Sequence, residues 1–150
     1  MAKVRVLFTD DRDRILLVRL KTPGQGLGWG LPGGTVEAGE ETPREAAARE
    51  VAEELGLDRP AGRLLSVDWV NRPEDRPRTV QVFDGGRLGA GDLARIRLDE
   101  EELAEWRLCS SSEAEALLPA APRGQLRQSL AVLAQGTGPV ELVDGVLAGH

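Results

Sequence analysis

Residues 33–57 read GGTVEAGEETPREAAAREVAEELGL, and this stretch decides how the sequence is interpreted. Its second half predicts a helix that begins after Thr42 and ends before Gly56. Thr42 can cap the first turn, Pro43 suits the first helical position, and Glu45 completes a capping box with Thr42. Gly56 is placed to end the helix in a left-handed conformation. The expected local structure is a glycine-rich loop followed by a capped, acidic helix.

Three carboxylates share one face of this helix, because Glu50, Glu53 and Glu54 stand at positions i, i+3 and i+4. Like charges at this spacing destabilise a helix by roughly a few tenths of a kcal/mol per pair. Mg²⁺ prefers carboxylate oxygens, waters and substrate phosphates, so the cluster is typical of a metal–phosphate site. An arbitrary acidic helix face is more often simply solvated. The preceding glycines favour the metal site, because their bare backbone lets a metal or a pyrophosphate come close.

Residues 34–57 strongly resemble the Nudix box of the MutT-like Nudix hydrolases, whose pattern is Gly-x5-Glu-x7-Arg-Glu-U-x-Glu-Glu-x-Gly-U with U aliphatic. The chain departs from the pattern by one extra residue between Gly34 and Arg49. Glu40 has the required spacing from Gly34, whereas Glu41 has the required spacing to Arg49. We place the extra residue in the loop before the helix, because Glu41 then keeps its spacing to Arg49. Which of the two glutamates pairs with Arg49 stays open at this point.

The resemblance implies a fold and a set of roles. The fold is α+β, a three-layer α/β/α sandwich with helices on both sides of a mixed sheet and the box at the edge of the sheet. Mg²⁺, or Mn²⁺ in its place, would be ligated by the Gly33 carbonyl, Glu50, Glu53 and Glu54. Arg49 would hold these glutamates through ion pairs, with Glu41 as its structural partner. Glu53 would also deprotonate or orient the water that attacks the diphosphate.

Candidates outside the box follow from the same resemblance and from position in the chain. A further acidic residue often assists as base or ligand in this family, and Glu102 is the first candidate, although a solvated charge run explains its segment equally well. Arg19 and Lys21, beside the glycine loop, could bind substrate phosphates, but such residues are usually just solvated. Trp29 and Trp69 could stack on a base, although tryptophan is more often part of the core.

The rest of the chain mixes predicted strands and helices irregularly, which favours an α+β fold over a regular βαβ series. Strands are expected at residues 4–8, 15–20, 64–70, 79–83 and 105–108. A short helix capped by Ser112 and Glu115 is expected to end near Leu118, and the prolines of 119–122 to stop it. A final helix is expected at 124–135 and a small hairpin near 140–146. Residues 22–34 are expected to form a loop.

Composition limits the chemistry that is available. The 150 residues fit one domain, 1–150, and the single cysteine, Cys109, excludes an internal disulfide or a multi-cysteine zinc site. The only histidine is His150, which argues against Ser/His/Asp catalysis and histidine metal sites. A net charge of −6 disfavours polymeric nucleic acid but allows small phosphorylated substrates held through a cation. Without a signal-peptide core or a long apolar run, a cytoplasmic protein without a membrane partner is expected.

Two other functions compete with hydrolysis. The segment 28–33 matches Gly-x-Gly-x-x-Gly and allows an NAD-type oxidoreductase, but Pro32 and the residues that follow prevent its last glycine from opening a helix. A catalytically idle Nudix-fold module that senses a nucleotide is the other alternative. The intact set of Glu50, Glu53 and Glu54 argues against it. Nucleoside triphosphates, nucleotide sugars, ADP-ribose and dinucleotide polyphosphates all stay open as substrates. Because the family often dimerises, a homodimer is also an option.

Overall fold

The computed structural model describes residues 1–23, 27–73 and 76–149, so His150 and parts of two predicted loops lie outside the described residues. Four helices are found in this part of the chain: α1 (Pro43–Leu55), α2 (Ala90–Arg95), α3 (Ser111–Leu117) and α4 (Ala120–Gln135). The strands of the described residues form one sheet: β1 (Ala2–Asp10), β2 (Ile15–Leu20), β3 (Trp29–Gly30), β4 (Gly33–Thr35), β5 (Leu64–Val70), β6 (Arg78–Leu88), β7 (Leu103–Cys109), β8 (Val140–Val143) and β9 (Val146–Leu147).

The sheet is mixed. Its main order is β3-β2-β1-β6-β5-β8-β9, with β4 beside β1 and β7 beside β2. β1 and β6 run parallel with Lys3 opposite Val80, and β5 and β8 are also parallel. The other strand pairs are antiparallel. The expectation of a mixed sheet is therefore confirmed.

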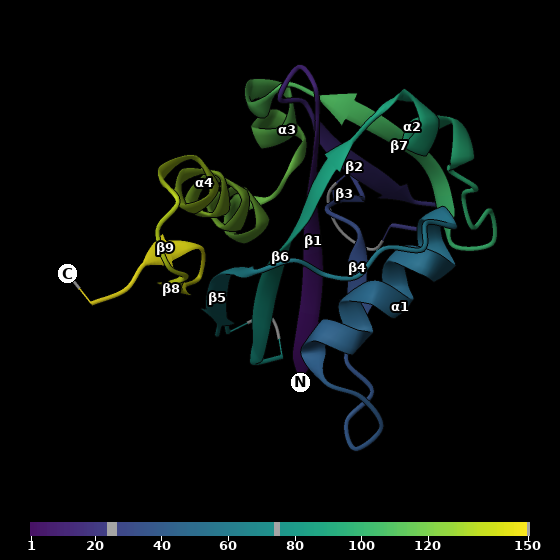
Figure 1. Ribbon diagram of the computed structural model, residues 1–150. Helices are drawn as coiled ribbons and strands as arrows, with labels where there is room; N and C mark the ends of the chain where they lie inside the picture. Colours follow the sequence, from purple (N-terminus) through teal and green to yellow (C-terminus); the bar gives the residue numbers. More distant parts are fainter. Residues whose placement is uncertain (24–26, 74–75, 150) are drawn as a thin grey trace.

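Helices cover both faces of the sheet (Figure 1). Successive side chains of a strand point to opposite faces, so β1 contributes side chains to two cores, one on each face of the sheet. Val4 and Val6 pack in one cluster with the apolar stripe of α1, which includes Val51. Leu7 packs in the other cluster, with α3, α4 and Leu126. The result is the expected three-layer α+β sandwich.

β1 changes its partner part-way along its length. Its residues Lys3 to Arg5 pair with β4, whereas Thr9 pairs with β2. Between these two regions the Val6 amide donates to the Pro32 carbonyl at 2.8 Å. Gly33 follows at the junction with φ +154°, and a Cβ there would lie 2.0 Å from the Val4 carbonyl oxygen. Only glycine therefore allows β4 to approach β1 at this junction, next to the acidic face of α1.

α1 begins and ends as the sequence predicts. The Thr42 hydroxyl accepts from the Glu45 amide at 3.2 Å, and the Glu45 carboxylate accepts from the Thr42 amide at 2.9 Å, which completes the capping box. Gly56 closes the helix with φ +69°, in the left-handed region that favours glycine. These short-range contacts set where the three glutamates of the helix stand.

Several boundaries differ from the prediction. α3 is capped by Ser110 and Glu113, not by Ser112 and Glu115, and it ends at Leu117, before the prolines, as expected. The final helix begins at Ala120, earlier than the expected residue 124. Pro119 is the N-cap of α4 and Pro122 lies in its first turn, where the missing N–H costs no helical hydrogen bond. The segment expected to be only a loop also contains β3 and β4, because its glycines pair with β2 and β1. α2 was not expected.

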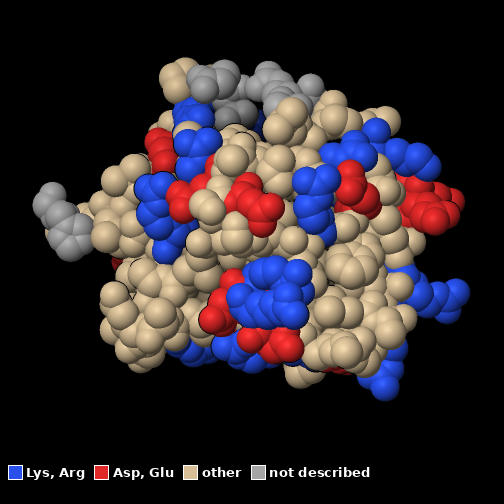
Figure 2. All heavy atoms as spheres, turned by 90° about the horizontal axis from the view of Figure 1, so that it is seen from above, with Lys and Arg blue, Asp and Glu red and all other residues tan. Residues whose placement is uncertain are grey.

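The C-terminal hairpin is present, with β8 and β9 joined at the predicted Asp144-Gly145 turn. Among the described residues, no helix is both long and apolar enough to cross a membrane. Basic and acidic side chains are interspersed on the surface seen from above, so neither sign of charge dominates that face (Figure 2).

Candidate metal and diphosphate site

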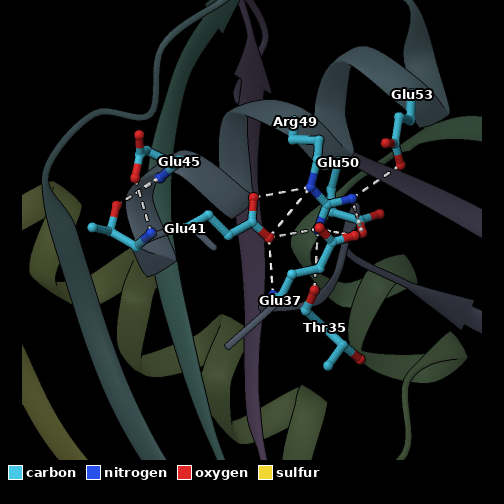
Figure 3. A network of polar contacts seen from close by, with 8 residues as sticks. Thr35, Glu37, Glu41, Glu45, Arg49, Glu50 and Glu53 are labelled. Atoms are coloured by element: carbon cyan, nitrogen blue, oxygen red, sulfur yellow. Dashed lines mark hydrogen bonds and ion pairs between the residues drawn. The ribbon is translucent and has the colours of Figure 1, made fainter. Parts of the chain in front are cut away.

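Arg49 is the centre of the polar network between α1 and the loop before it (Figure 3). Its Nε and Nη2 donate to the Glu41 carboxylate at 3.0 and 2.8 Å. Its Nη1 donates to Glu50 at 3.0 Å and to Glu53 at 3.2 Å, and its Nη2 donates to the Thr35 carbonyl at 3.2 Å. These carboxylates, Glu41 first, raise the pKa of Arg49. One guanidinium thus ties the loop to two of the predicted metal ligands.

The partner of Arg49 is Glu41 and not Glu40. The Glu40 and Glu41 amides both donate to the Glu37 carbonyl, at 3.1 and 3.2 Å, in a tight turn that absorbs the extra residue. The Glu37 amide in turn donates to the Glu41 carboxylate at 3.0 Å. The Glu40 side chain instead lies near that of Glu37 and raises the pKa of Glu37. The insertion therefore leaves the contact between Glu41 and the helix intact.

Glu54 lies at the junction of β1 and β4. Its carboxylate is only 5% exposed and accepts from the Gly33 amide at 3.1 Å. Burial raises the pKa of Glu54 to about 7, against the opposing effects of this hydrogen bond and of Arg5. A largely buried carboxylate with a raised pKa, beside bare glycine backbone, marks a candidate functional group.

Glu50 lies against the neighbouring glycine. A Cβ added to Gly34 would meet the Glu50 carboxylate carbon at 2.5 Å, so the absence of a side chain makes room for this carboxylate. Burial raises the pKa of Glu50, while Arg49 lowers it and the nearby charges of Glu53 and Glu102 raise it further. Glu102 also raises the pKa of Glu54. The segment before β7 thus brings Glu102 close to both box carboxylates.

These residues fit a hard divalent cation by their chemistry. The donors are carboxylate oxygens that repel one another, and the Gly33 backbone stands among them. Within the described ranges, no group of three acidic side chains converges on one point. Glu54 is turned to Gly33, whereas the Glu53 side chain, 55% exposed, is turned to Arg49.

Arg19 and Lys21 contact the protein itself. The Arg19 guanidinium donates to Glu105 at 3.0 Å and lies over the Trp29 ring. The Lys21 ammonium donates to the Glu100 carbonyl at 2.7 Å, and its amide donates to the Glu102 carbonyl at 2.8 Å. Their contacts fix the acidic segment beside the site, and phosphate binding by either residue stays a prediction.

The two tryptophans differ in their surroundings. Trp29 is 8% exposed and packs in the core, and the guanidinium groups of Arg19 and Arg107 lie 5.8 and 4.6 Å from the centre of its ring. Trp69 lies on β5 and is 44% exposed. In the sheet, β1 and β6 separate β5 from β4. A stacking role for either ring stays a prediction.

Arg5 is a site residue that sequence analysis missed. Together with Gly33, Glu54 and Trp29 it lines a cavity of about 180 Å³ at the junction of β1 and β4. Its Nη1 donates to the Leu31 carbonyl at 3.2 Å. The signal that could have found it is a charged residue in a strand at a position flanked on both sides by buried valines.

The fingerprint Gly28 to Gly33 does not form a dinucleotide-binding turn. Its last glycine enters β4, whereas the fingerprint requires that glycine to open a helix. This geometry removes the structural basis for the NAD-type oxidoreductase.

The fold and the acidic site together define a class. The NUDIX domain family matches residues 1–129, and the chain belongs to this family. Its enzyme class is that of the Nudix pyrophosphohydrolases, which act on phosphoric anhydride bonds.

Solved structures share the fold. The MutT protein from Methanosarcina mazei Go1 is 26% identical with a TM-score of 0.73, over 87% of this chain and 93% of that chain. A C. elegans Ap4A hydrolase is 20% identical with a TM-score of 0.70, over 90% and 98%. The NUDIX domain of Shewanella oneidensis NrtR, complexed with ADP ribose, is 18% identical with a TM-score of 0.70, over 89% and 88%. Comparison with curated proteins gave no significant match.

Proposed function

We propose that this protein hydrolyses the diphosphate bond of a nucleoside diphosphate linked to another moiety, with Mg²⁺ or Mn²⁺ as cofactor. One observation carries the proposal: Glu50 and Glu54 lie against the bare backbone of Gly34 and Gly33. Because neither glycine carries a side chain, both carboxylates reach this backbone, where they are candidate ligands of a cation that would in turn bind the diphosphate. Substrates of this class are nucleoside triphosphates, nucleotide sugars, ADP-ribose and dinucleoside polyphosphates.

The residues divide the work by their exposure. Glu50, Glu54, Glu53 and the Gly33 carbonyl would hold the cation, which when bound supplies charge neutralisation and a more acidic water. Glu53, the most exposed of the three carboxylates, takes the proton of the attacking water or orients that water. Glu102 is the second candidate for this role, because its charge raises the pKa of both Glu50 and Glu54. Arg49 keeps Glu50 and Glu53 in position through the hydrogen bonds described above.

A substrate panel tests the proposal. Representatives of the four substrate classes are incubated with the protein and Mg²⁺ or Mn²⁺, and phosphorylated products are measured. At least one compound is expected to be hydrolysed, and EDTA is expected to stop the reaction. Glu53→Gln is expected to lower kcat by about 10²-fold or more, which is the usual contribution of a general base.

Matched variants make the test specific. Glu102→Gln and Glu101→Gln remove the same charge from adjacent, exposed positions. Of these two residues, it is Glu102 whose charge raises the pKa of Glu50. Glu101→Gln is expected to keep wild-type activity, and Glu102→Gln to lose it in part. Turnover that survives both EDTA and Glu53→Gln contradicts the proposal. Nucleotide binding without turnover in the wild type would favour the idle sensor instead.

The broader expectations from the sequence stand as predictions alongside the function. They are a single domain over residues 1–150, a cytoplasmic location, a small phosphorylated substrate, no polymeric nucleic acid or membrane partner, and a monomer or homodimer. Gel filtration with light scattering decides the oligomeric state directly.

A further inference from the structure

Three basic side chains lie on one face of the central strands. Lys3 and Arg5 alternate along β1 with the valines that face α1, so both leave the strand on the opposite face. β6 runs parallel to β1 with Lys3 opposite Val80. Arg78, two residues before Val80, therefore leaves β6 on the same face as Lys3. We call Lys3, Arg5 and Arg78 the basic row.

The basic row has no acidic ion-pair partner among the described residues. No carboxylate of this part of the chain forms an ion pair with any member of the row. Arg5 donates to the Leu31 carbonyl, and Arg78 donates to the Arg76 carbonyl at 3.4 Å. All three are half-buried. Burial first, then the charges of Arg5 and Arg78, lowers the pKa of Lys3. Such like-charged neighbours gain from an anion that bridges them.

The row starts at the candidate metal site. Arg5 lines the same cavity as Glu54 and Gly33. The negative charges of Glu54 and Glu50 both raise the pKa of Arg5, and that of Glu50 also raises the pKa of Lys3. On β1, Lys3 and Arg5 are about 6.6 Å apart along the strand, as two steps of extended chain require. By the strand register, the basic charges therefore extend from Arg5, beside the carboxylates, to Lys3 and Arg78.

We propose that the basic row binds the phosphates that extend beyond the scissile diphosphate, so that the preferred substrates carry a chain of three or more phosphates. This inference rests on the proposed diphosphate hydrolysis and names its substrate class. Guanidinium groups bind phosphate oxygens in two-point contacts, and a lysine adds a compact charge. A nucleotide sugar places a neutral ring where a triphosphate places a further anion. The row therefore selects a nucleoside triphosphate or a dinucleoside polyphosphate over a nucleotide sugar.

Kinetic selectivity is the first test. kcat/KM is measured for a nucleoside triphosphate and for a nucleotide sugar, with wild type, Lys3→Gln, Arg78→Gln and the double variant. Each single change is expected to lower kcat/KM for the triphosphate about 10-fold, the effect of one lost charge-assisted hydrogen bond. The nucleotide sugar is expected to change less than 3-fold. Arg95→Gln, which removes an exposed charge from α2, is the matched control and is expected to change neither.

Binding without catalysis is the second test. Titration calorimetry with inorganic tripolyphosphate and inorganic pyrophosphate is carried out on wild type and the double variant, with Mg²⁺ and with EDTA. Tripolyphosphate is expected to bind wild type more tightly than pyrophosphate, and the double variant is expected to lose this preference. Thermal melts and the conservative Arg78→Lys variant separate lost contacts from lost folding.

The outcomes separate the two proposals. A wild type that hydrolyses no compound but prefers tripolyphosphate through the row overturns the hydrolase proposal and keeps only the phosphate-binding role of the row. A wild type that hydrolyses several substrates, with the double variant unchanged in triphosphate selectivity and in tripolyphosphate affinity, overturns this inference and leaves the hydrolase proposal in place.

Discussion

Gly34→Ala should reduce catalysis much more than stability. A Cβ at this position would lie 2.5 Å from the Glu50 carboxylate carbon and 2.5 and 2.7 Å from its oxygens, whereas ordinary contacts are 3.4–4 Å. The backbone of Gly34 needs no left-handed conformation, so an alanine is compatible with the chain path. The Glu50 carboxylate, at the end of a flexible side chain, must therefore retreat by about 1 Å.

The size of the effect follows from this displacement. A misplacement of about 1 Å in a catalytic group costs about 10²-fold in rate, or about 2.7 kcal/mol of transition-state stabilisation. The free energy of unfolding should change by less than about 1 kcal/mol, because the displaced group is the end of a side chain and leaves no cavity in the core. Gly91→Ala is the control, since nothing lies within 4 Å of a Cβ at that position.

The assay combines kcat/KM for the best substrate of the panel, Mn²⁺ affinity by electron paramagnetic resonance, and urea unfolding. Gly34→Ala should lose both activity and Mn²⁺ affinity while Gly91→Ala keeps both. If Gly34→Ala retained wild-type turnover and Mn²⁺ affinity, the assignment of Glu50 as a ligand held under Gly34 would be wrong.

Three further predictions concern charge. Without divalent cations, the free energy of unfolding should fall by up to about 3 kcal/mol as the pH rises from about 4.5 to 7. The reason is that the pKa of Glu54 is raised to about 7 in the folded protein, so Glu54 retains a proton that the unfolded chain has lost. Urea titrations at several pH values should show a flatter profile for Glu54→Gln. Arg49→Lys should lower kcat/KM about 10-fold or more, because an ammonium cannot replace the guanidinium's contacts to several carboxylates; unchanged kinetics would contradict the positioning role. Asp68→Ala should destabilise the protein by about 2–4 kcal/mol in urea, because the Gln125 amide at 2.7 Å and the Gly145 amide at 3.1 Å would lose a buried acceptor. A melt equal to wild type would show that neither amide depends on Asp68.

Sequence was most informative where local contacts decide the structure. α1 has the predicted boundaries because Thr42, Glu45 and Gly56 act within one turn of each end. Placing the extra residue in the loop preserves the spacing between Glu41 and Arg49, and these two residues are hydrogen-bonded in the structure. The family and the α+β sandwich followed from this stretch as well.

Sequence was least informative where distant segments meet. β3 and β4 are strands only because glycines pair with β2 and β1, and composition alone indicated a loop. The final helix was expected to begin at residue 124, but it begins at Ala120, because Pro122 is tolerated in the first turn of α4. Arg5 appeared to be one more residue of a strand, and its place beside Glu54 depends on the pairing of β1 with β4. Such placements require the tertiary fold.

The parallel pairing of β1 with β6 also affects how the chain is synthesised. Lys3 can pair with Val80 only after Val80 has been synthesised, roughly 4 to 15 s later at the usual 5–20 residues per second of translation. During this interval apolar residues such as Leu7 and Phe8 have no finished sheet to enter. Nascent chains are then open to aggregation, and we expect the yield of folded protein in cells to depend on chaperones and on expression temperature.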